Sequence, residues 1–267
     1  MKPIKCIFLF ILFIFLTDIS QAQLLMEKSR VELDVQPGST IIDDMFLNNT
    51  SDKFVEVRIY WQDFEYVPPF NGKKKFIPPG DFEFSMADWV TFSPQKILIK
   101  PRGREKINYV IKIPADARGG YYGVLFFENV PEAAKMSGIG VNLITRLGSL
   151  FFLRSNERSK HTVIKDFDLE DGTIKGIIQN QGNVIIFPKG VYYILDQDSM
   201  VAKRGELKKI YLPPLKDAEF QLDLPNLDVG QYTLILTFDL DDGDSIVREV
   251  DFFKERDATI TVTEIRK

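Results

Sequence analysis

The side chains that most often carry catalysis are scarce in this chain. Its 267 residues include one histidine, His161, and one cysteine, Cys6. A serine nucleophile would have to take its general base from that one histidine, and a zinc site would lack its usual cysteine and histidine ligands. Carboxylates are numerous, but no pair stands out as the acid and base of a glycoside hydrolase. The sequence therefore predicts a protein that is not an enzyme and that uses no cofactor or metal ion.

The acidic run Asp239–Asp244 has the composition of a cation-binding loop. An EF-hand loop carries glycine at its sixth position and glutamate at its twelfth, whereas here Gly243 is fifth and Val250 is twelfth. An Asp-Gly pair between two alternating apolar runs is typical of a hairpin turn. We therefore expect two strands joined at this point rather than a calcium site.

The amino-terminal segment has the features of a cleaved export signal. Lys2 and Lys5 precede the apolar run Ile7–Leu16, and small residues lead up to Ala22. The run is shorter than the roughly 20 residues that cross a bilayer. We expect cleavage after Ala22, which leaves a periplasmic chain with no membrane span and no disulfide. The formal net charge of −4 argues against a nucleic-acid partner.

Alternating apolar residues predict strands through most of the remaining chain. In Val55–Trp61 and Ile107–Ile113 every second side chain is apolar, and Tyr232–Leu240 has the clearest alternation. Tyr121–Phe127 is apolar at almost every position, which predicts a strand in the middle of a sheet. Short alternating runs separated by glycine and proline turns are typical of β-sandwiches. The expected fold class is all-β, with two immunoglobulin-like β-sandwich domains in tandem.

A polar, charged stretch from Arg154 to Thr162 divides the chain. The expected domains are a signal peptide at 1–22, an N-terminal immunoglobulin-like domain at 23–154, a linker at 155–162 and a C-terminal β-sandwich at 163–267. His161 lies in the linker, where we expect it to be solvated. The run Lys73–Lys75 falls in an extended loop or hairpin, and we expect it to form a solvated tip.

The first half of the exported chain resembles the N-terminal domain of the PapD-type periplasmic pilus chaperones. The likeness covers Arg30 to about Arg154 and rests on the order and spacing of several segments. They are Ser29–Leu33, Tyr60–Trp61, Trp89–Pro94 with the turn Pro101–Gly103, Ile113–Pro114, and Val141–Arg146 leading into Leu150–Phe152. The resemblance implies a chaperone that binds protein subunits by β-strand addition during assembly of surface or pilus-like structures.

The resemblance also implies a donor strand. In that family an exposed strand of the first domain lends alternating apolar side chains to an incomplete subunit. The corresponding side chains here are Ile139, Val141 and Leu143. The alternative is that these three side chains face this protein's own core.

A carboxylate anchor is the second feature that the resemblance implies. The family holds a subunit's terminal carboxylate in the cleft between its domains with an arginine and a lysine. The arginine corresponds to Arg30, but the lysine position falls on Gly148 or Ser149. Arg146 is the nearest cation on that strand, and a guanidinium group can bind a carboxylate. Arg30 and Arg146 are therefore the candidate anchors.

Glycine-rich segments point to a second family. Gly119–Gly123, Asn180–Asn183, Pro188–Gly190 and Val229–Tyr232 resemble segments of the two-domain WxL-interacting surface proteins. That resemblance implies a cell-wall or surface binding module whose partner is peptidoglycan or another protein. Those proteins normally end in a transmembrane helix and a basic tail, and the sequence up to Lys267 has neither, which favours the periplasmic chaperone.

Three interpretations therefore remain, and each makes a structural prediction. The chaperone ranks first and calls for an open strand edge, because such edges are normally protected unless they are used. The cell-wall module ranks second and calls for a shallow groove lined by aromatic residues such as Trp61 or Trp89. A hydrolase ranks last and calls for a deep pocket with two close carboxylates.

Overall fold

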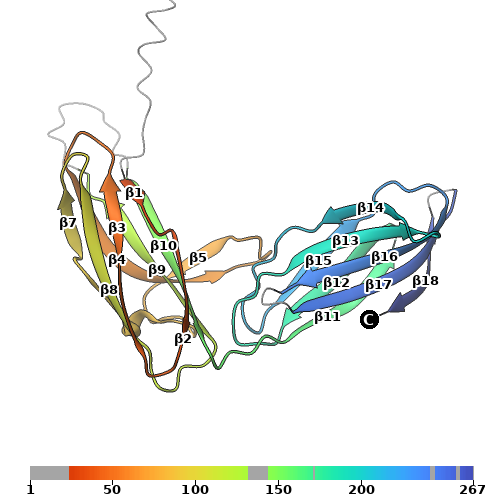
Figure 1. Ribbon diagram of the computed structural model, residues 1–267, viewed down its shortest axis with the longest axis horizontal. Helices are drawn as coiled ribbons and strands as arrows, with labels where there is room; N and C mark the ends of the chain where they lie inside the picture. The colour runs from red at the N-terminus through yellow and green to blue at the C-terminus, as the bar shows by residue number, and fades with distance from the viewer. Residues whose placement is uncertain (1–23, 132–143, 171, 241–243, 257–258, 267) are drawn as a thin grey trace, which may run out of the picture.

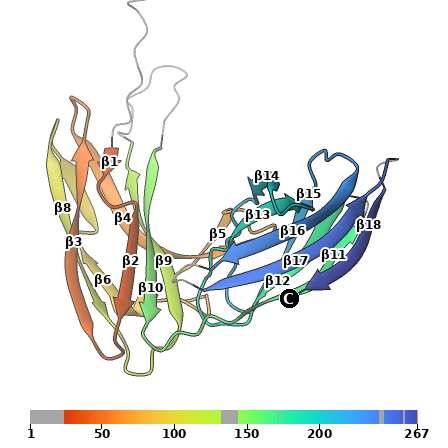
Figure 2. The same cartoon turned by 45° about the vertical axis from the view of Figure 1, so that its right-hand side comes forward.

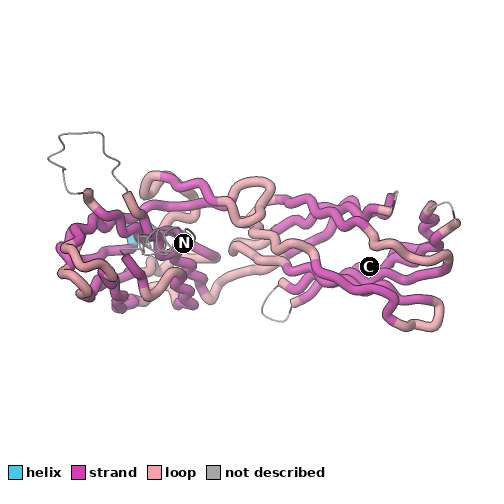
Figure 3. The backbone as a smooth tube through the Cα atoms, turned by 90° about the horizontal axis from the view of Figure 1, so that it is seen from above, coloured by secondary structure: helices cyan, strands magenta, loops and turns pink. Residues whose placement is uncertain are grey.

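The protein folds into two β-sandwiches, as expected from the alternating apolar pattern. The computed structural model describes residues 24–131, 144–170, 172–240, 244–256 and 259–266. Figure 1 shows the two sandwiches with their strands running in different directions, and Figure 2 shows the same arrangement after a turn about the vertical axis. Seen from above, the sandwiches lie end to end (Figure 3). The all-β class and the tandem immunoglobulin-like architecture are confirmed.

The first sandwich consists of a four-stranded sheet facing a larger one. Its strands are β1 (Leu24–Met26), β2 (Arg30–Val35), β3 (Thr40–Asn49), β4 (Val55–Tyr66), β5 (Lys74–Ile77), β6 (Val90–Ser93), β7 (Lys96–Ile99), β8 (Arg104–Lys112), β9 (Gly120–Asn129) and β10 (Arg146–Ser155), with a short 3-10 turn at Ala87–Trp89. The smaller sheet has the order β1-β3-β8-β6. The larger has the order β2-β10-β9-β4-β5, with β7 also paired to β4.

The larger sheet of the first sandwich is apolar on both faces. In β4, Ile59 and Trp61 point into the core of the first sandwich. Phe64 and Tyr66 have the opposite parity and join an apolar cluster that continues into the second sandwich. β9 lies between β10 and β4, as its apolar sequence predicts. It divides its side chains in the same way, with Leu125 and Phe127 on the first face and Tyr122, Val124 and Phe126 on the second.

The second sandwich packs a three-stranded sheet against a five-stranded sheet. Its strands are β11 (Thr162–Glu170), β12 (Thr173–Asn180), β13 (Lys189–Asp196), β14 (Val201–Glu206), β15 (Asp217–Asp223), β16 (Gly230–Asp239), β17 (Ser245–Lys254) and β18 (Ile260–Arg266). The sheets have the orders β11-β12-β15 and β14-β13-β16-β17-β18.

The acidic run closes a hairpin, as predicted. Strands β16 and β17 pair antiparallel up to Asp239 opposite Ser245. The Leu240 N–H donates to the Asp244 carbonyl at 2.9 Å, which closes the connection. Residues 241–243 of the run lie outside the described residues.

The two sandwiches are joined by buried polar contacts as well as by the shared apolar cluster. The hydroxyl of Tyr122 accepts a hydrogen bond from the Ile185 N–H at 2.6 Å, and the Gly120 N–H donates to the Asn183 carbonyl at 2.9 Å. Gly119 has φ of +79°, and a Cβ there would lie 2.4 Å from the Asn183 oxygen. Only glycine fits this close approach of the two backbones.

The hairpin of β4 and β5 extends the first sandwich toward the second (Figures 1 and 2). β5 pairs antiparallel with the end of β4, from Asp63 opposite Ile77 to Tyr66 opposite Lys74. The segment between these strands reaches the second sandwich, because the Tyr211 N–H donates to the Phe70 carbonyl at 2.8 Å. Within the described part of the chain, no helix is long and apolar enough to cross a membrane.

Candidate functional site

One half of β10 has an open edge. β10 pairs with β9 from Arg146 to Arg154, but on its other side it pairs with β2 only from Leu150 to Ser155. Among the described residues, Arg146–Ser149 have no strand partner on that side. The Leu150 N–H points to this side, where it donates to the Ser29 carbonyl at 3.0 Å. Backbone direction alternates along a strand, so the N–H groups of Arg146 and Gly148 face the same open side.

The predicted donor residues cannot be placed against this edge. Ile139, Val141 and Leu143 lie outside the described residues, so their role stays a prediction. Ile144, the first described residue after them, is 59% exposed. The Thr145 N–H donates to the Asn129 side chain and the Asn129 N–H donates to the Thr145 carbonyl. The strand edge is therefore continuous with the segment that carries the predicted donor residues.

Arg30 lies at the junction of the two sandwiches. Its guanidinium carbon is 4.1 Å from the ring centroid of Phe152 in β10 and 4.9 Å from that of Phe187 in the second sandwich. A guanidinium group over an aromatic face is attracted by the ring and keeps its N–H donors free at the edge. Its one carboxylate partner among the described residues is Glu32. Arg30 is thus held in place by one ring from each sandwich.

The two positions that correspond to the family's lysine have no room for one. Ser149 is fully buried, and its hydroxyl donates to the Lys28 carbonyl at 2.7 Å. Gly148 faces the side of the sheet that carries Phe126. A Cβ at Gly148 would lie 2.9 Å from side-chain atoms of both Phe126 and Val124. The space that a lysine stem would need is therefore filled by these two side chains.

Arg146 lies on the same sheet face as Arg30 but farther along it. Its guanidinium carbon is 4.3 Å from the ring centroid of Phe126 and 5.4 Å from that of Phe76. Leu150 is the partner of Arg30 in the β2–β10 register. Four residues of a strand therefore separate the two arginines, or roughly 13 Å. The structure does not bring Arg30 and Arg146 together around one carboxylate.

A carboxylate already occupies the neighbourhood of Arg146. The Tyr60 hydroxyl donates to Glu128 at 2.8 Å and Arg58 donates to it at 2.7 Å. The hydrogen bond from Tyr60 lowers the pKa of Glu128 most, and Arg58 and Arg146 lower it further. Arg146 is thus part of a charged network at the start of the open edge.

Lys74, which the sequence did not single out as a site residue, lies at the same junction as Arg30. The Lys74 ammonium is 5.0 Å from the ring centroid of Tyr66 and donates to the Gly72 carbonyl at 3.2 Å. Burial lowers the pKa of Lys74, and repulsion from Arg30 lowers it further. The expectation that Lys73–Lys75 form only a solvated tip is wrong for Lys74, because the β4–β5 hairpin packs against the second sandwich.

Lys209, an exposed residue of the second sandwich, lies over two rings at the junction of the sandwiches. Its ammonium is 4.9 Å from the ring centroid of Phe187 and 5.3 Å from that of Tyr211. The sequence around it, a pair of lysines before Ile210, carries no signal for a site. Its position depends on how the two sandwiches meet.

Four aromatic rings pack together at the junction of the sandwiches beside these cations, and we call them the aromatic floor: Tyr66, Phe152, Phe187 and Tyr211. The rings of Tyr66 and Tyr211 are 4.9 Å apart, and those of Phe152 and Phe187 are 6.0 Å apart. Burial raises the pKa of the Tyr66 hydroxyl, although Arg30 opposes this. The neutral Tyr66 hydroxyl therefore lies among the same rings as the cations.

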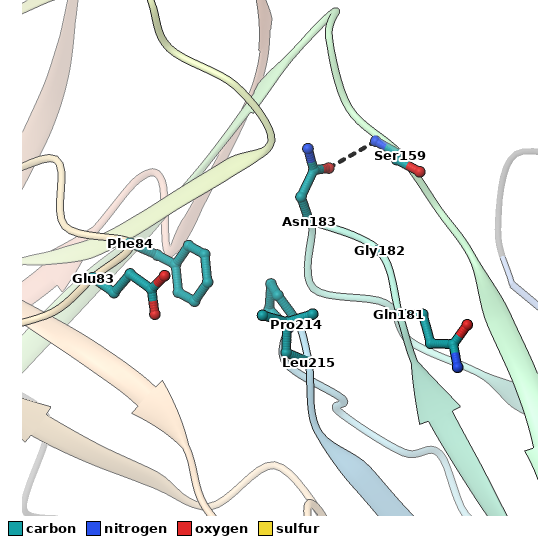
Figure 4. Close-up of a pocket in the computed structure, with 8 residues that line it drawn as sticks. All are labelled: Glu83, Phe84, Ser159, Gln181, Gly182, Asn183, Pro214 and Leu215. Atoms are coloured by element: carbon teal, nitrogen blue, oxygen red, sulfur yellow. Dashed lines mark hydrogen bonds between the residues drawn. The ribbon is translucent and has the colours of Figure 1, made fainter.

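Two pockets among the described residues bear on the hydrolase interpretation. One of about 270 Å³ lies at the junction of the sandwiches (Figure 4). In it the Ser159 N–H donates to the Asn183 side chain at 2.7 Å, and Glu83 is the one carboxylate of its lining. A second pocket of about 360 Å³ contains Glu56 and Glu128, each paired with a cation. The residues that the structure describes include no cluster of three or more potential metal ligands.

Neither tryptophan lines an open groove. Trp61 is 7% exposed and belongs to the core of the first sandwich, where its ring N–H donates to Asp63 at 3.2 Å. Trp89 is half-buried with its ring centroid 4.2 Å from that of Tyr121. The aromatic groove that would favour a cell-wall module is not formed by these two side chains.

Comparison with known proteins identifies the fold. No protein-family model and no curated protein matches the chain. A chain from a chaperone-tip adhesin complex of CFA/I fimbriae biogenesis is 14% identical with a TM-score of 0.54, covering 85% of this chain and 97% of that one. The class 5 fimbriae chaperone CfaA is 15% identical with a TM-score of 0.53, covering 84% and 97%.

These likenesses confirm the fold that the resemblance to the pilus chaperones implied. The chain has the two-domain fold of the PapD-type fimbrial chaperones, as the sequence resemblance predicted. At such low identity the likeness concerns the fold alone. The resemblance to the WxL-interacting proteins, with peptidoglycan as the partner, stays a prediction.

Proposed function

We propose that this chain is an exported, non-enzymatic assembly chaperone that binds protein subunits in the periplasm by β-strand addition. The observation that carries the proposal is the open edge of β10 at Arg146–Ser149 in a chain with a fimbrial-chaperone fold. Unpaired strand edges are normally covered, twisted away or charged unless a partner uses them. The process served is the assembly of surface or pilus-like structures.

In this mechanism the edge supplies backbone groups and the preceding segment supplies side chains. An incoming subunit strand pairs with the outward N–H and carbonyl groups of Arg146 and Gly148 and of the residues before them. Alternate apolar side chains at Ile139, Val141 and Leu143 fill the subunit's incomplete core. Main-chain hydrogen bonds give affinity in this mode of recognition, and alternate side chains give specificity.

Arg30 has the position and chemistry to hold the subunit's terminal carboxylate. Its guanidinium group is oriented by Phe152 and Phe187 at the domain junction. A planar guanidinium binds a carboxylate through two parallel N–H···O bonds, which fixes direction as well as position. The anchored end would set the register of the rest of the subunit strand along β10.

Co-purification tests the donor strand. The tagged protein is co-expressed with the small exported proteins encoded beside it and recovered from the periplasm. Leu143→Asp should abolish capture of a strand-deficient subunit, because a carboxylate would then enter an apolar groove. Asn142→Asp adds the same charge at the adjacent position of opposite parity and should leave capture intact. Capture that survives Leu143→Asp, or that Asn142→Asp abolishes equally, contradicts the proposed donor residues.

A further inference from the structure

Three cations from three separate segments lie against rings of the aromatic floor, and we call them the cation group. Arg30 begins β2, Lys74 begins β5, and Lys209 follows β14 in the second sandwich. Arg30 and Lys209 each lie 4.9 Å from the ring centroid of Phe187. Lys74 lies over Tyr66, which packs on Tyr211 beneath Lys209. The group therefore spans both sandwiches.

The charge of the cation group is poorly balanced by the protein. Glu32 pairs with Arg30, but among the described residues no carboxylate pairs with Lys74 or Lys209. Burial lowers the pKa of Lys74, and repulsion from Arg30 lowers it further. An anion bound between Lys74 and Arg30 would oppose this shift, because an opposite charge within a few ångströms favours the charged form of each group.

The segment that carries Lys209 packs against the β4–β5 hairpin of the first sandwich. The Tyr211 N–H donates to the Phe70 carbonyl at 2.8 Å. A Cβ on Gly72, whose φ is +100°, would lie 3.2 Å from the Tyr211 ring. This close packing sets Tyr211, and with it Lys209, against the hairpin that carries Lys74. A site built on such fixed elements loses little entropy when a ligand binds.

We propose that Lys209 and Lys74 complete the carboxylate site of Arg30, so that the second sandwich takes a direct part in binding the terminal carboxylate of a polypeptide. Lys209 and Lys74 supply positive charge in place of the family's strand lysine. Gly148 cannot be replaced by that lysine, because Phe126 and Val124 fill the space there. The Tyr66 hydroxyl is a further donor to the same carboxylate. This inference rests on the proposed function for the identity of the ligand, but it assigns residues that the fold resemblance does not.

Calorimetric titration with two peptides tests the assignment. The probes are an N-acetylated pentapeptide of alternating threonine and valine with a free carboxylate, and the same peptide with a terminal amide, both at low ionic strength. Hydrogen bonds to charged groups predict that the full exported protein binds the acid about tenfold or more tightly than the amide. Lys209→Met and Lys74→Met should each reduce this preference about threefold to tenfold, and Arg30→Met should remove it.

Matched controls come from neighbouring lysines. Lys208 and Lys73 are exposed, as Lys209 is, but the ring contacts of the cation group belong to Lys74 and Lys209. Lys208→Met and Lys73→Met remove the same charge, and the preference should stay within about twofold of the unmodified protein. Thermal unfolding of each variant checks that the fold is intact. Methionine keeps most of the lysine stem, so packing on the aromatic floor is retained.

The outcomes separate the inference from the proposed function. If Arg30→Met removes the preference while Lys209→Met and Lys74→Met leave it unchanged, the inference is overturned and the Arg30 anchor stands. If the unmodified protein binds acid and amide equally, both are overturned, while strand addition is judged by co-purification. Inorganic phosphate and acetate are also compared as competitors of the acid peptide. If phosphate displaces the peptide at a tenfold lower concentration than acetate, the site is one for phosphate and the carboxylate assignment is wrong.

Discussion

Tyr122 couples the two sandwiches through one hydroxyl group. The side chain is 2% exposed, and its ring packs against Phe64 and Phe152. The hydroxyl accepts the Ile185 N–H at 2.6 Å. A Cβ on Gly120 would lie 1.9 Å from the same hydroxyl, so the neighbouring backbone is adapted to it. The polar contact is therefore enclosed by apolar groups, where an unpaired donor is costly.

Removal of this hydroxyl should destabilise the protein. Tyr122→Phe leaves the ring in place but deprives the buried Ile185 N–H of its acceptor, which costs about 1–3 kcal/mol in the free energy of unfolding. Chemical denaturation measures the change. Tyr193→Phe removes a hydroxyl from a ring that is 38% exposed, and should change the free energy of unfolding by less than about 0.5 kcal/mol. Equal effects of the two substitutions would refute the role assigned to the Ile185 contact.

The candidate site shows which residues a sequence can reveal. Arg30 is identified through the order of segments around it, and its place at the domain junction follows from the fold. Lys74 is hidden in a run of three lysines, where composition favours a solvated tip. The position of Lys209 depends on a contact between Tyr211 and Phe70. These two residues lie far apart in the sequence and meet only when both sandwiches have formed. No local pattern encodes such a contact.

At the scale of elements, β10 combines a protected half with an open half. β2 covers it from Leu150 onward, and the core of the first sandwich takes up Phe151 and Leu153. The half from Arg146 to Ser149 keeps its β9 partner but has no partner on the other side among the described residues. The strand is therefore paired along one edge over its whole length and unpaired along the other edge at Arg146–Ser149 among the described residues.

Proline at Arg146 should block this edge without unfolding the strand. The Arg146 N–H faces the open side, so Arg146→Pro removes no hydrogen bond to β9 but takes away a donor for the incoming strand. We expect capture of a subunit to fall about tenfold in a pull-down titration, with little change in the unfolding temperature. Arg146→Ala removes the side chain and keeps the N–H. If Arg146→Ala weakens capture as much as Arg146→Pro, the side chain and not the edge is responsible.

The strands themselves were predictable to different degrees. β4, β9 and β16 have long alternating or continuous apolar patterns, and the structure contains each of them. β14 (Val201–Glu206) was not anticipated, because it reads Val-Ala-Lys-Arg-Gly-Glu with no alternation. It is one of the two edge strands of its sheet, and among the described residues it pairs with β13. None of its residues is buried, so the strand carries little apolar signal.

At the scale of the whole molecule, the two sandwiches share one apolar cluster. It includes Phe64 and Tyr122 from the first sandwich and Phe187 and Leu212 from the second. Residues 156–161, between β10 and β11, form a short connection between sandwiches that are in contact. Interfaces of this buried, apolar kind couple the stability of two domains, whereas small polar interfaces let them move independently.

Calorimetry should therefore record one unfolding transition for the exported chain. Phe187→Ala removes a ring from the shared cluster and should lower the midpoint of that transition by about 10 °C or more. Phe253→Ala removes a ring that is 40% exposed on the second sandwich, and should shift the midpoint by no more than a few degrees. Two resolved transitions in the unmodified protein would show that the sandwiches unfold independently.

The packing of Phe126 beside Gly148 limits which substitutions this strand position can accept. A lysine introduced at Gly148 alone meets the ring and the Val124 side chain at contact distances that real structures do not tolerate. Loss of the Phe126 ring alone leaves a cavity that costs about 3–5 kcal/mol. Removing the ring would also leave the Val124 methyl group 2.9 Å from the new Cβ. A lysine at this strand position therefore requires changes at both Phe126 and Val124, and no single substitution installs it.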